Sequence, residues 1–171
     1  MNLARLLTRA SRIWPEAPAI CHGNKRHASY RQFAQRAGCI GRSLVHDYGL
    51  AKGDRVGVIM KNQPEYLEAL YGIWFAGLAA VPINAKLHPR EIAYILDHSG
   101  ASFCFVSAAL EHDIPDAVST VVTPGPAWRR MQAGQPIDVV AVEKSDLAWL
   151  FYTSGTTGQP KGAMLSHGSL R

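Results

Sequence analysis

The sequence predicts an α/β domain with a parallel sheet and flanking helices. Three observations predict it: short apolar, β-branched runs recur, segments of helical periodicity separate them, and Gly or Pro marks the boundaries. Alternating strands and helices imply right-handed crossovers and therefore parallel strands. With 171 residues, 47% hydrophobic and 18% charged, the chain suits one globular domain with a substantial core.

Residues 1–13 predict an amphipathic surface helix that Pro15 stops. Its apolar residues recur at helical spacing, with the arginines turned away. These apolar residues are Leu3, Leu6, Leu7 and Ala10. Because the segment is Arg-rich and free of acids, a mitochondrial transit peptide is the alternative, but the helical spacing favours a surface helix.

A hairpin and a long helix are expected next. Two short strands, residues 17–21 and 26–30, flank Gly23 and Asn24, which tolerate the positive φ of a tight turn. Residues 30–48 carry apolar side chains at helical intervals and predict a helix that Gly49 ends.

The middle of the chain alternates between strands and helices. The predicted strands are residues 56–60, 79–83 and 102–106, and the predicted helices are residues 62–76 and 89–98. Asn62 is expected to cap the first of these helices, with Glu65 reaching back and Pro64 in the first turn. Gly77 and Gly100 are expected to end the two helices.

The last third predicts two further strands around an irregular connection. The strands are residues 118–123 and 147–152, and the prolines and glycines of residues 124–136 predict a linker. Four tryptophans are expected to be packing residues rather than a stacking platform. They are Trp14, Trp74, Trp128 and Trp149.

Charge and composition exclude several classes of function. The net charge is +5, and its excess lies before residue 43, but no basic cluster with interleaved aromatics occurs, which argues against nucleic-acid binding. The three cysteines form no C-x-x-C pair and the seven histidines show no metal-ligand spacing. The longest uncharged stretch, residues 69–85, is interrupted and falls short of the roughly 20 apolar residues of a membrane span. A reducing, cytoplasmic location is expected.

Residues 153–162, Thr-Ser-Gly-Thr-Thr-Gly-Gln-Pro-Lys-Gly, directly follow the last predicted strand. Glycines let backbone N–H groups turn inward around an anion, hydroxyls bind phosphate oxygens or Mg²⁺, and a lysine adds positive charge. The spacing fits neither a Walker A loop nor a dinucleotide-binding glycine pattern. By composition alone such a loop is more often a flexible turn, so the order of its residues decides.

That order, Phe-Tyr-Thr-Ser-Gly-Thr-Thr-Gly-Gln-Pro-Lys-Gly-Ala-Met-Leu-Ser-His over residues 151–167, resembles the phosphate-loop signature of the AMP-forming acyl-CoA synthetases and the adenylate-forming superfamily. Residues 28–33 and 75–84 are similar to two further motifs of that family. The resemblance implies that residues 1–171 are the first part of the large N-terminal domain of such an enzyme, ending after the phosphate loop.

The resemblance implies that this loop holds the β- and γ-phosphates of ATP. The implied phosphate-contacting residues are Thr153, Ser154, Gly155, Thr156, Thr157 and Lys161, with Thr156 also the implied Mg²⁺ ligand. His167 is interpreted as structural. The family's later motifs do not occur, so no catalytic residue is expected within residues 1–171.

Enzymes of this family make an acyl-adenylate from a carboxylic acid and Mg·ATP, then pass the acyl group to the thiol of coenzyme A. ATP, Mg²⁺, coenzyme A and a carboxylic acid are therefore the expected small-molecule partners. A fatty acid is the favoured substrate class, because residues 62–106 resemble the fatty-acyl and medium-chain branch.

Activity is expected to require the remainder of the enzyme, since phosphate and acyl groups must be positioned together. Two alternatives stay open. One is a non-catalytic nucleotide-binding or interaction module; the other is the front of a peptide-synthetase adenylation domain or of a coumarate-ligase-like enzyme.

Overall fold

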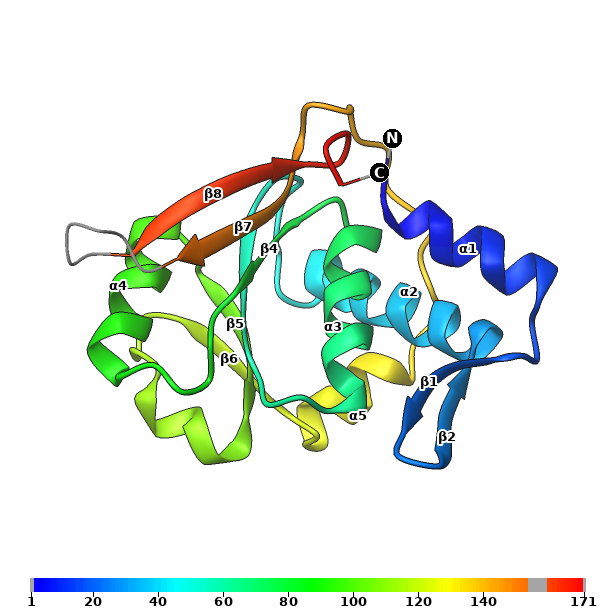
Figure 1. The fold of residues 1–171 in the computed structure, drawn as a ribbon, viewed down its shortest axis with the longest axis horizontal. Helices are drawn as coiled ribbons and strands as arrows, with labels where there is room; N and C mark the ends of the chain where they lie inside the picture. Colours follow the sequence, from blue (N-terminus) through cyan, green and yellow to red (C-terminus); the bar gives the residue numbers. More distant parts are fainter. Residues whose placement is uncertain (1, 154–159, 171) are drawn as a thin grey trace.

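A computed structural model of the chain describes residues 2–153 and 160–170 (Figure 1). Its centre is a six-stranded sheet with the strand order β6-β5-β3-β4-β7-β8. The strands are β3 (Arg55–Ile59), β4 (Ala79–Pro82), β5 (Phe103–Ser107), β6 (Ser119–Thr123), β7 (Leu147–Thr153) and β8 (Lys161–Ser166). The first five are parallel, as the sequence predicts, and β8 returns antiparallel to β7.

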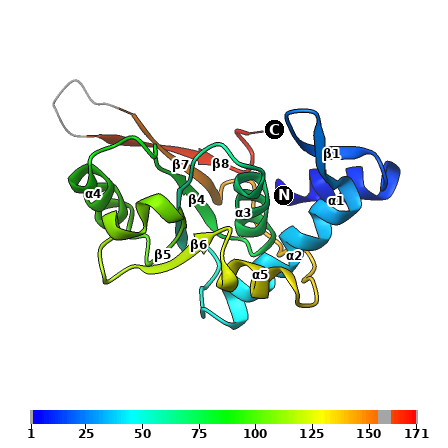
Figure 2. The ribbon, with the colours of Figure 1, turned by 90° about the horizontal axis from the view of Figure 1, so that it is seen from below.

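Helices cover both faces of the sheet (Figure 2). One face carries α1 (Ala4–Ile13), α2 (Tyr30–His46), α3 (Pro64–Phe75) and α5 (Pro126–Gln132), and the other carries α4 (Pro89–Ser99). A hydrophobic core lies on each face of the sheet, and alternate residues of one strand contribute to both. In β5, Phe103 and Phe105 face the four-helix layer, whereas Cys104 and Val106 face α4.

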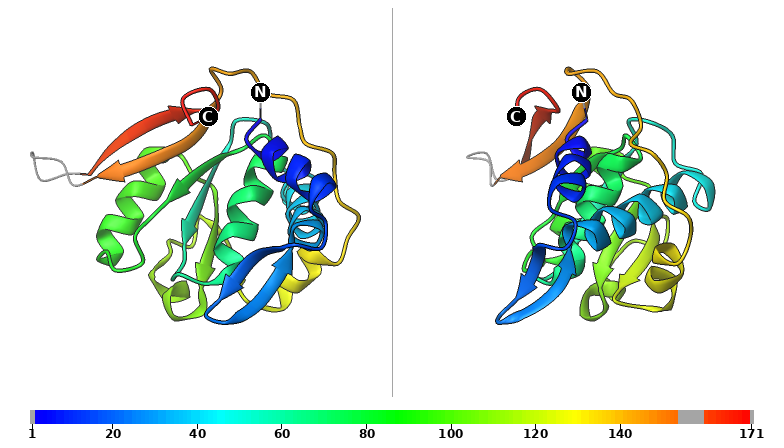
Figure 3. Two further views of the ribbon diagram at one scale, coloured as in Figure 1. Left: turned by 45° about the vertical axis from the view of Figure 1, so that its right-hand side comes forward. Right: turned by 90° about the vertical axis from the view of Figure 1, so that its right-hand side faces the viewer.

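The predicted hairpin is confirmed as a separate two-stranded sheet of β1 (Pro18–His22) and β2 (Lys25–Ser29). Gly23 takes a φ of +57° in the turn. Figure 3 shows this hairpin extending beside α1 and α2, away from the main sheet. The hairpin leads directly into α2, where Ser29 and Gln32 form a capping box.

Glycines set the distance between the two longest helices. A Cβ at Gly72 of α3 would lie 2.5 Å from Cγ2 of Ile40 on α2, and one at Gly41 would lie 3.0 Å from the Gly72 carbonyl oxygen. Close packing of α2 on α3 therefore depends on glycine, which has no side chain, at both positions.

Several predicted helix ends are confirmed and others are wrong. Gly100 caps α4 at a φ of +65°, and Gly77 follows the last residues of α3 at +72°. The predicted Asn62 cap is wrong, because α3 begins after Gln63 and has no side-chain cap. Gly49 does not end α2 directly: α2 stops at His46, where the Asp47 carboxylate accepts a hydrogen bond from Ser43 Oγ.

The predicted linker over residues 124–136 contains the short helix α5, and a 3-10 turn, η1 (Ala108–Asp113), follows β5. Trp128 of α5 is buried with its ring 5.3 Å from that of Phe105, so this helix completes the core. Trp74 is also buried and Trp149 is half-buried, but Trp14 is 58% exposed and is not a packing residue.

The predicted surface helix is confirmed in α1, whose buried face joins the main core. Leu3 and Leu7 are buried, whereas Leu6 is 46% exposed, contrary to its predicted place on the apolar face. All three cysteines are free. Among the described residues, no helix is long and apolar enough to cross a membrane.

A buried carboxylate joins four elements of this layer. Glu68 on α3 is fully buried, with its Oε1 2.8 Å from the Arg36 guanidinium of α2 and 3.0 Å from Nε2 of His27 on β2. Its Oε2 accepts a hydrogen bond from Gln132 of α5 at 2.6 Å. Both carboxylate oxygens are thus satisfied away from water, which a buried charge requires.

Replacing Glu68 by alanine is expected to lower the free energy of unfolding by about 2–3 kcal/mol, because Gln132 and the half-buried Arg36 lose their shared hydrogen-bond acceptor. Urea denaturation followed by circular dichroism measures this loss.

The matched control is Glu16→Gln, which removes the solvent-exposed ion pair between Glu16 and Arg31. This variant is expected to lose no more than about 1 kcal/mol. Equal losses in the two variants would contradict the role assigned to the buried carboxylate.

Candidate functional site

The order of the strands places a crevice between β3 and β4. The chain leaves β3 through α3 on one face and leaves β4 through α4 on the opposite face, so the direction of winding reverses between these neighbours. In open α/β sheets, ligands bind at such a switch point, outside the carboxyl ends of the strands.

A cavity of about 580 Å³ opens at this edge. The residues that follow β3 and β4 supply most of its lining, together with Tyr66 and the end of β7. They are Met60, Lys61, Asn62, Ile83, Asn84, Ala85 and Lys86. A neighbouring cavity of about 230 Å³ shares Asn84 and Tyr152 with the first and reaches Thr153 and Pro160.

The pairing of β7 with β8 brings Thr153 and Lys161 together. They are register partners at the end of the hairpin, both are exposed, and they flank residues 154–159 in the sequence. The predicted positions Ser154, Gly155 and Thr156, like Thr157, lie outside the described residues. The structure therefore places two of the six predicted phosphate-contacting residues, at the edge of the sheet where the crevice opens.

Positive charge also gathers at this edge. Lys61 and Lys86 line the larger cavity, and neither makes an ion pair with a described residue. The side chain of Asn84 fixes the turn before Lys86, accepting a hydrogen bond from the Lys86 backbone N–H at 3.0 Å. Uncompensated lysines in a crevice suit an anionic ligand.

Tyr152 forms the wall between the two cavities. Its hydroxyl lies 2.7 Å from Nδ1 of His98 on α4, which anchors the end of β7 to the opposite helix. Burial raises the pKa of Tyr152. The sequence analysis missed Lys61, Lys86 and Tyr152 as site residues, although each stands at or just beyond the end of an apolar strand.

His167 lies at the other end of the hairpin, away from the crevice. It is 1% exposed, its Nδ1 accepts the Leu3 backbone N–H at 3.1 Å, and its own backbone N–H donates to the Asp146 carbonyl. These contacts support its interpretation as a structural residue. In the part of the chain that is described, no cluster of three or more His, Cys, Asp or Glu side chains could hold a metal ion.

The fold and the crevice define an α/β domain with a lysine-lined cavity at the carboxyl edge of a parallel sheet, where such sheets bind their ligands. The sequence pattern identifies the kind: residues 7–171 match the family model described as AMP-binding enzyme, and the chain belongs to that family.

The chain is similar in sequence and in fold to several known proteins. The chain is 35% identical to a feruloyl-CoA synthase of Amycolatopsis over 95% of its length, and 36% identical to the pyochelin synthetase PchF of Pseudomonas aeruginosa over 92%. A fatty acyl CoA synthetase structure from Mycobacterium tuberculosis superposes with a TM-score of 0.82 at 28% identity, covering 97% of this chain.

The chain spans only part of these relatives. It covers 33% of the feruloyl-CoA synthase, 8% of the pyochelin synthetase and 34% of the fatty acyl CoA synthetase. The relatives named here are a CoA synthase and a synthetase, and the matching family model describes an enzyme.

Burial of His167 predicts a pH-dependent stability. Burial lowers the pKa of His167 below its ordinary value of 6.5, so the unfolded chain binds a proton more readily than the native one. The free energy of unfolding is therefore expected to fall as the pH drops below about 6.5. Urea denaturation at pH 7.5 and pH 5 measures the difference.

The His167→Asn variant is the comparison, because it keeps an acceptor for the Leu3 N–H without a titrating ring. It should lose less stability over this interval than the wild type. Identical pH profiles for the two proteins would show that His167 carries none of the dependence.

Proposed function

We propose that the complete protein containing residues 1–171 is an ATP-dependent acid–thiol ligase, which activates a carboxylic acid as acyl-AMP and transfers the acyl group to coenzyme A. The observation that carries the proposal is the pairing of Thr153 with Lys161 beside the switch-point crevice. Family membership supports the reaction, and the unpaired lysines of the crevice support an anionic substrate.

The phosphate-contacting set of this proposal comprises Thr153, Ser154, Gly155, Thr156, Thr157 and Lys161, assigned from the order of the residues. Hydroxyls and backbone N–H groups of such a set donate hydrogen bonds to phosphate oxygens. The positive Lys161 ammonium would lie where negative charge accumulates on the departing pyrophosphate. This electrostatic attraction would lower the barrier to adenylation. Thr156 is the proposed Mg²⁺ contact, and the ion would neutralise further phosphate charge.

A fatty acid is the proposed acyl substrate. The fatty acyl CoA synthetase of M. tuberculosis supports this class, and the feruloyl-CoA synthase supports an aromatic acid instead. A relative named L-proline–[L-prolyl-carrier protein] ligase, 33% identical to this chain, favours a second candidate function, in which the acyl group passes to the thiol of a carrier protein rather than to coenzyme A.

Lys161→Ala and Thr157→Ala in the complete protein are expected to lower the rate of ATP–pyrophosphate exchange about 10²–10³-fold, the loss typical of removing one donor to a developing anion. Lys144→Ala is the control, since Lys144 is exposed and lies near the opposite end of the hairpin. Exchange at the wild-type rate in both loop variants would overturn the assignment of the loop.

The substrate class is tested by exchange assays with saturated fatty acids of increasing length, ferulate and benzoate. The proposal expects a higher kcat/KM for the fatty acids than for either aromatic acid. Consumption of the free coenzyme A thiol, followed with each activated acid, separates transfer to coenzyme A from adenylation alone. Adenylation without any loss of the coenzyme A thiol would favour the carrier-protein alternative.

Residues 1–171 alone are proposed to be inactive in adenylation, because they span only a third of the related CoA ligases. A purified polypeptide of these residues should show no pyrophosphate exchange while its circular dichroism shows folded structure. Turnover by this polypeptide would contradict the proposal; binding of ATP without turnover would favour the non-catalytic module.

A further inference from the structure

The outer face of α1 presents three arginines without acidic partners. Arg5, Arg9 and Arg12 are exposed, and none makes an ion pair or a side-chain hydrogen bond with a described residue. Their spacing of four and three residues puts them on one side of the helix. No acidic residue occurs in α1 to balance them.

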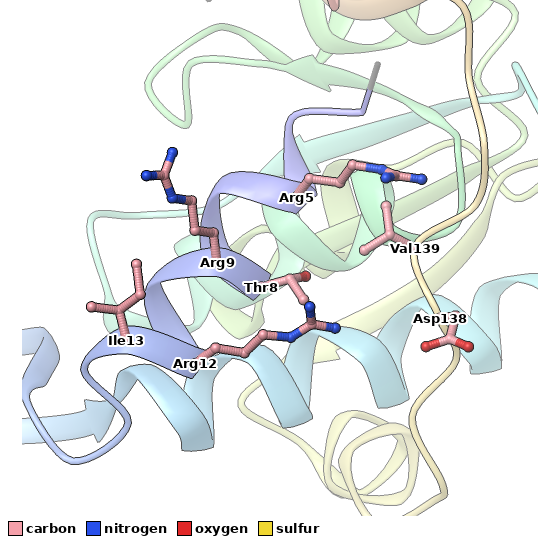
Figure 4. A pocket seen from close by; sticks show the side chains of 7 residues that line it. All are labelled: Arg5, Thr8, Arg9, Arg12, Ile13, Asp138 and Val139. Atoms are coloured by element: carbon pink, nitrogen blue, oxygen red, sulfur yellow. The ribbon is translucent and has the colours of Figure 1, made fainter.

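A groove of about 420 Å³ runs between α1 and the segment at residues 138–139. Figure 4 shows the guanidinium groups of Arg5 and Arg12 directed toward this segment and that of Arg9 directed away from it. Asp138 is the one carboxylate among the residues that line the groove. Its charge leaves the groove net positive.

An apolar arc adjoins the arginines. Leu6 is 46% exposed, Ile13 is 51% exposed and Trp14, directly after the helix, is 58% exposed. Leu6 and Ile13 are seven residues apart and share a face of the helix. Arg9, three residues from Leu6 and four from Ile13, stands between them, so charged and apolar groups are interleaved on one surface.

We propose that this surface, defined by Arg5, Leu6, Arg9, Arg12, Ile13 and Trp14, binds the anionic phospholipid face of a membrane. The guanidinium groups bind lipid phosphates, while the two aliphatic side chains and the indole enter the interface between headgroups and acyl chains. The other side of α1 is held in the core through Leu3 and Leu7, so the surface is preformed. This proposal is independent of the proposed enzymatic activity.

The mixed character of the surface selects this occupant. A free anion would use the arginines and leave Leu6, Ile13 and Trp14 in water. An anionic bilayer uses both groups, because it pairs a negative surface with an apolar layer beneath it. The charges of this surface are arginines, whereas the uncompensated charges of the crevice are lysines.

The test is co-sedimentation of the complete protein with sucrose-loaded vesicles at 0.1 M NaCl. Vesicles of phosphatidylcholine with 30% phosphatidylglycerol are expected to bind it, and vesicles of pure phosphatidylcholine to bind it at least about tenfold more weakly. Arg9→Glu with Arg12→Glu is expected to lower the partition coefficient by at least about 25-fold, because each arginine lost costs about fivefold and each added glutamate is repelled. Leu6→Ser with Ile13→Ser is expected to lower it about tenfold.

The matched control is Arg129→Glu with Arg130→Glu on α5, which makes the same change of net charge at exposed residues of another helix. It should bind nearly as well as the wild type. Circular dichroism checks that every variant is folded, and Arg9→Lys with Arg12→Lys keeps the charge and should retain most binding.

Three results would overturn the proposal. They are no binding of the folded wild type to the anionic vesicles, equal losses for the α1 and α5 charge reversals, and unchanged binding in the Leu6 and Ile13 variant. Sedimentation of the wild type without vesicles, abolished by that variant, would assign the surface to a second copy of the chain instead.

Discussion

The carboxylate of Glu68 sits in the core, where an unpaired charge would cost several kcal/mol, so its partners must all be in place. Those partners come from β2, α2 and α5, and the carboxylate itself comes from α3. Satisfying one buried group therefore fixes the hairpin and three helices relative to one another. Because α3 is the connection between β3 and β4, this arrangement also positions the switch-point crevice.

Local signals predicted most of the parallel sheet and α4, because apolar β-branched runs and a glycine in the left-handed region act within a few residues. Local signals failed where more than one neighbouring residue could begin a helix. Asn62 has the chemistry of a helix cap, yet α3 begins after Gln63, whose side chain donates to the Thr123 carbonyl and accepts from Ser107. The seven residues of α5 lie among prolines and glycines, and burial of Trp128 and Met131 stabilises them as a helix.

Some residues of the candidate site could be predicted from the sequence and others could not. The order of residues 151–167 predicts Thr153 and Lys161 as site residues, because the members of a predicted phosphate loop are contiguous in sequence. Lys61 and Lys86 come from turns after two different strands, and only the strand order brings those turns to one crevice. Leu6 shows the limit of periodicity: the spacing of α1 fits an apolar face that includes it, but the core takes Leu3, Ala4 and Leu7.

The hydrogen bond from the Leu3 N–H to His167 joins groups 164 residues apart. A ribosome makes α1 first, yet one of its docking partners emerges only after both strands of the last hairpin have been synthesised. Its other neighbours, α2 and α3, are made much earlier, so only this contact of the helix is delayed. The N-terminal end of α1 therefore gains its hydrogen bond to His167 only after β8 has been made.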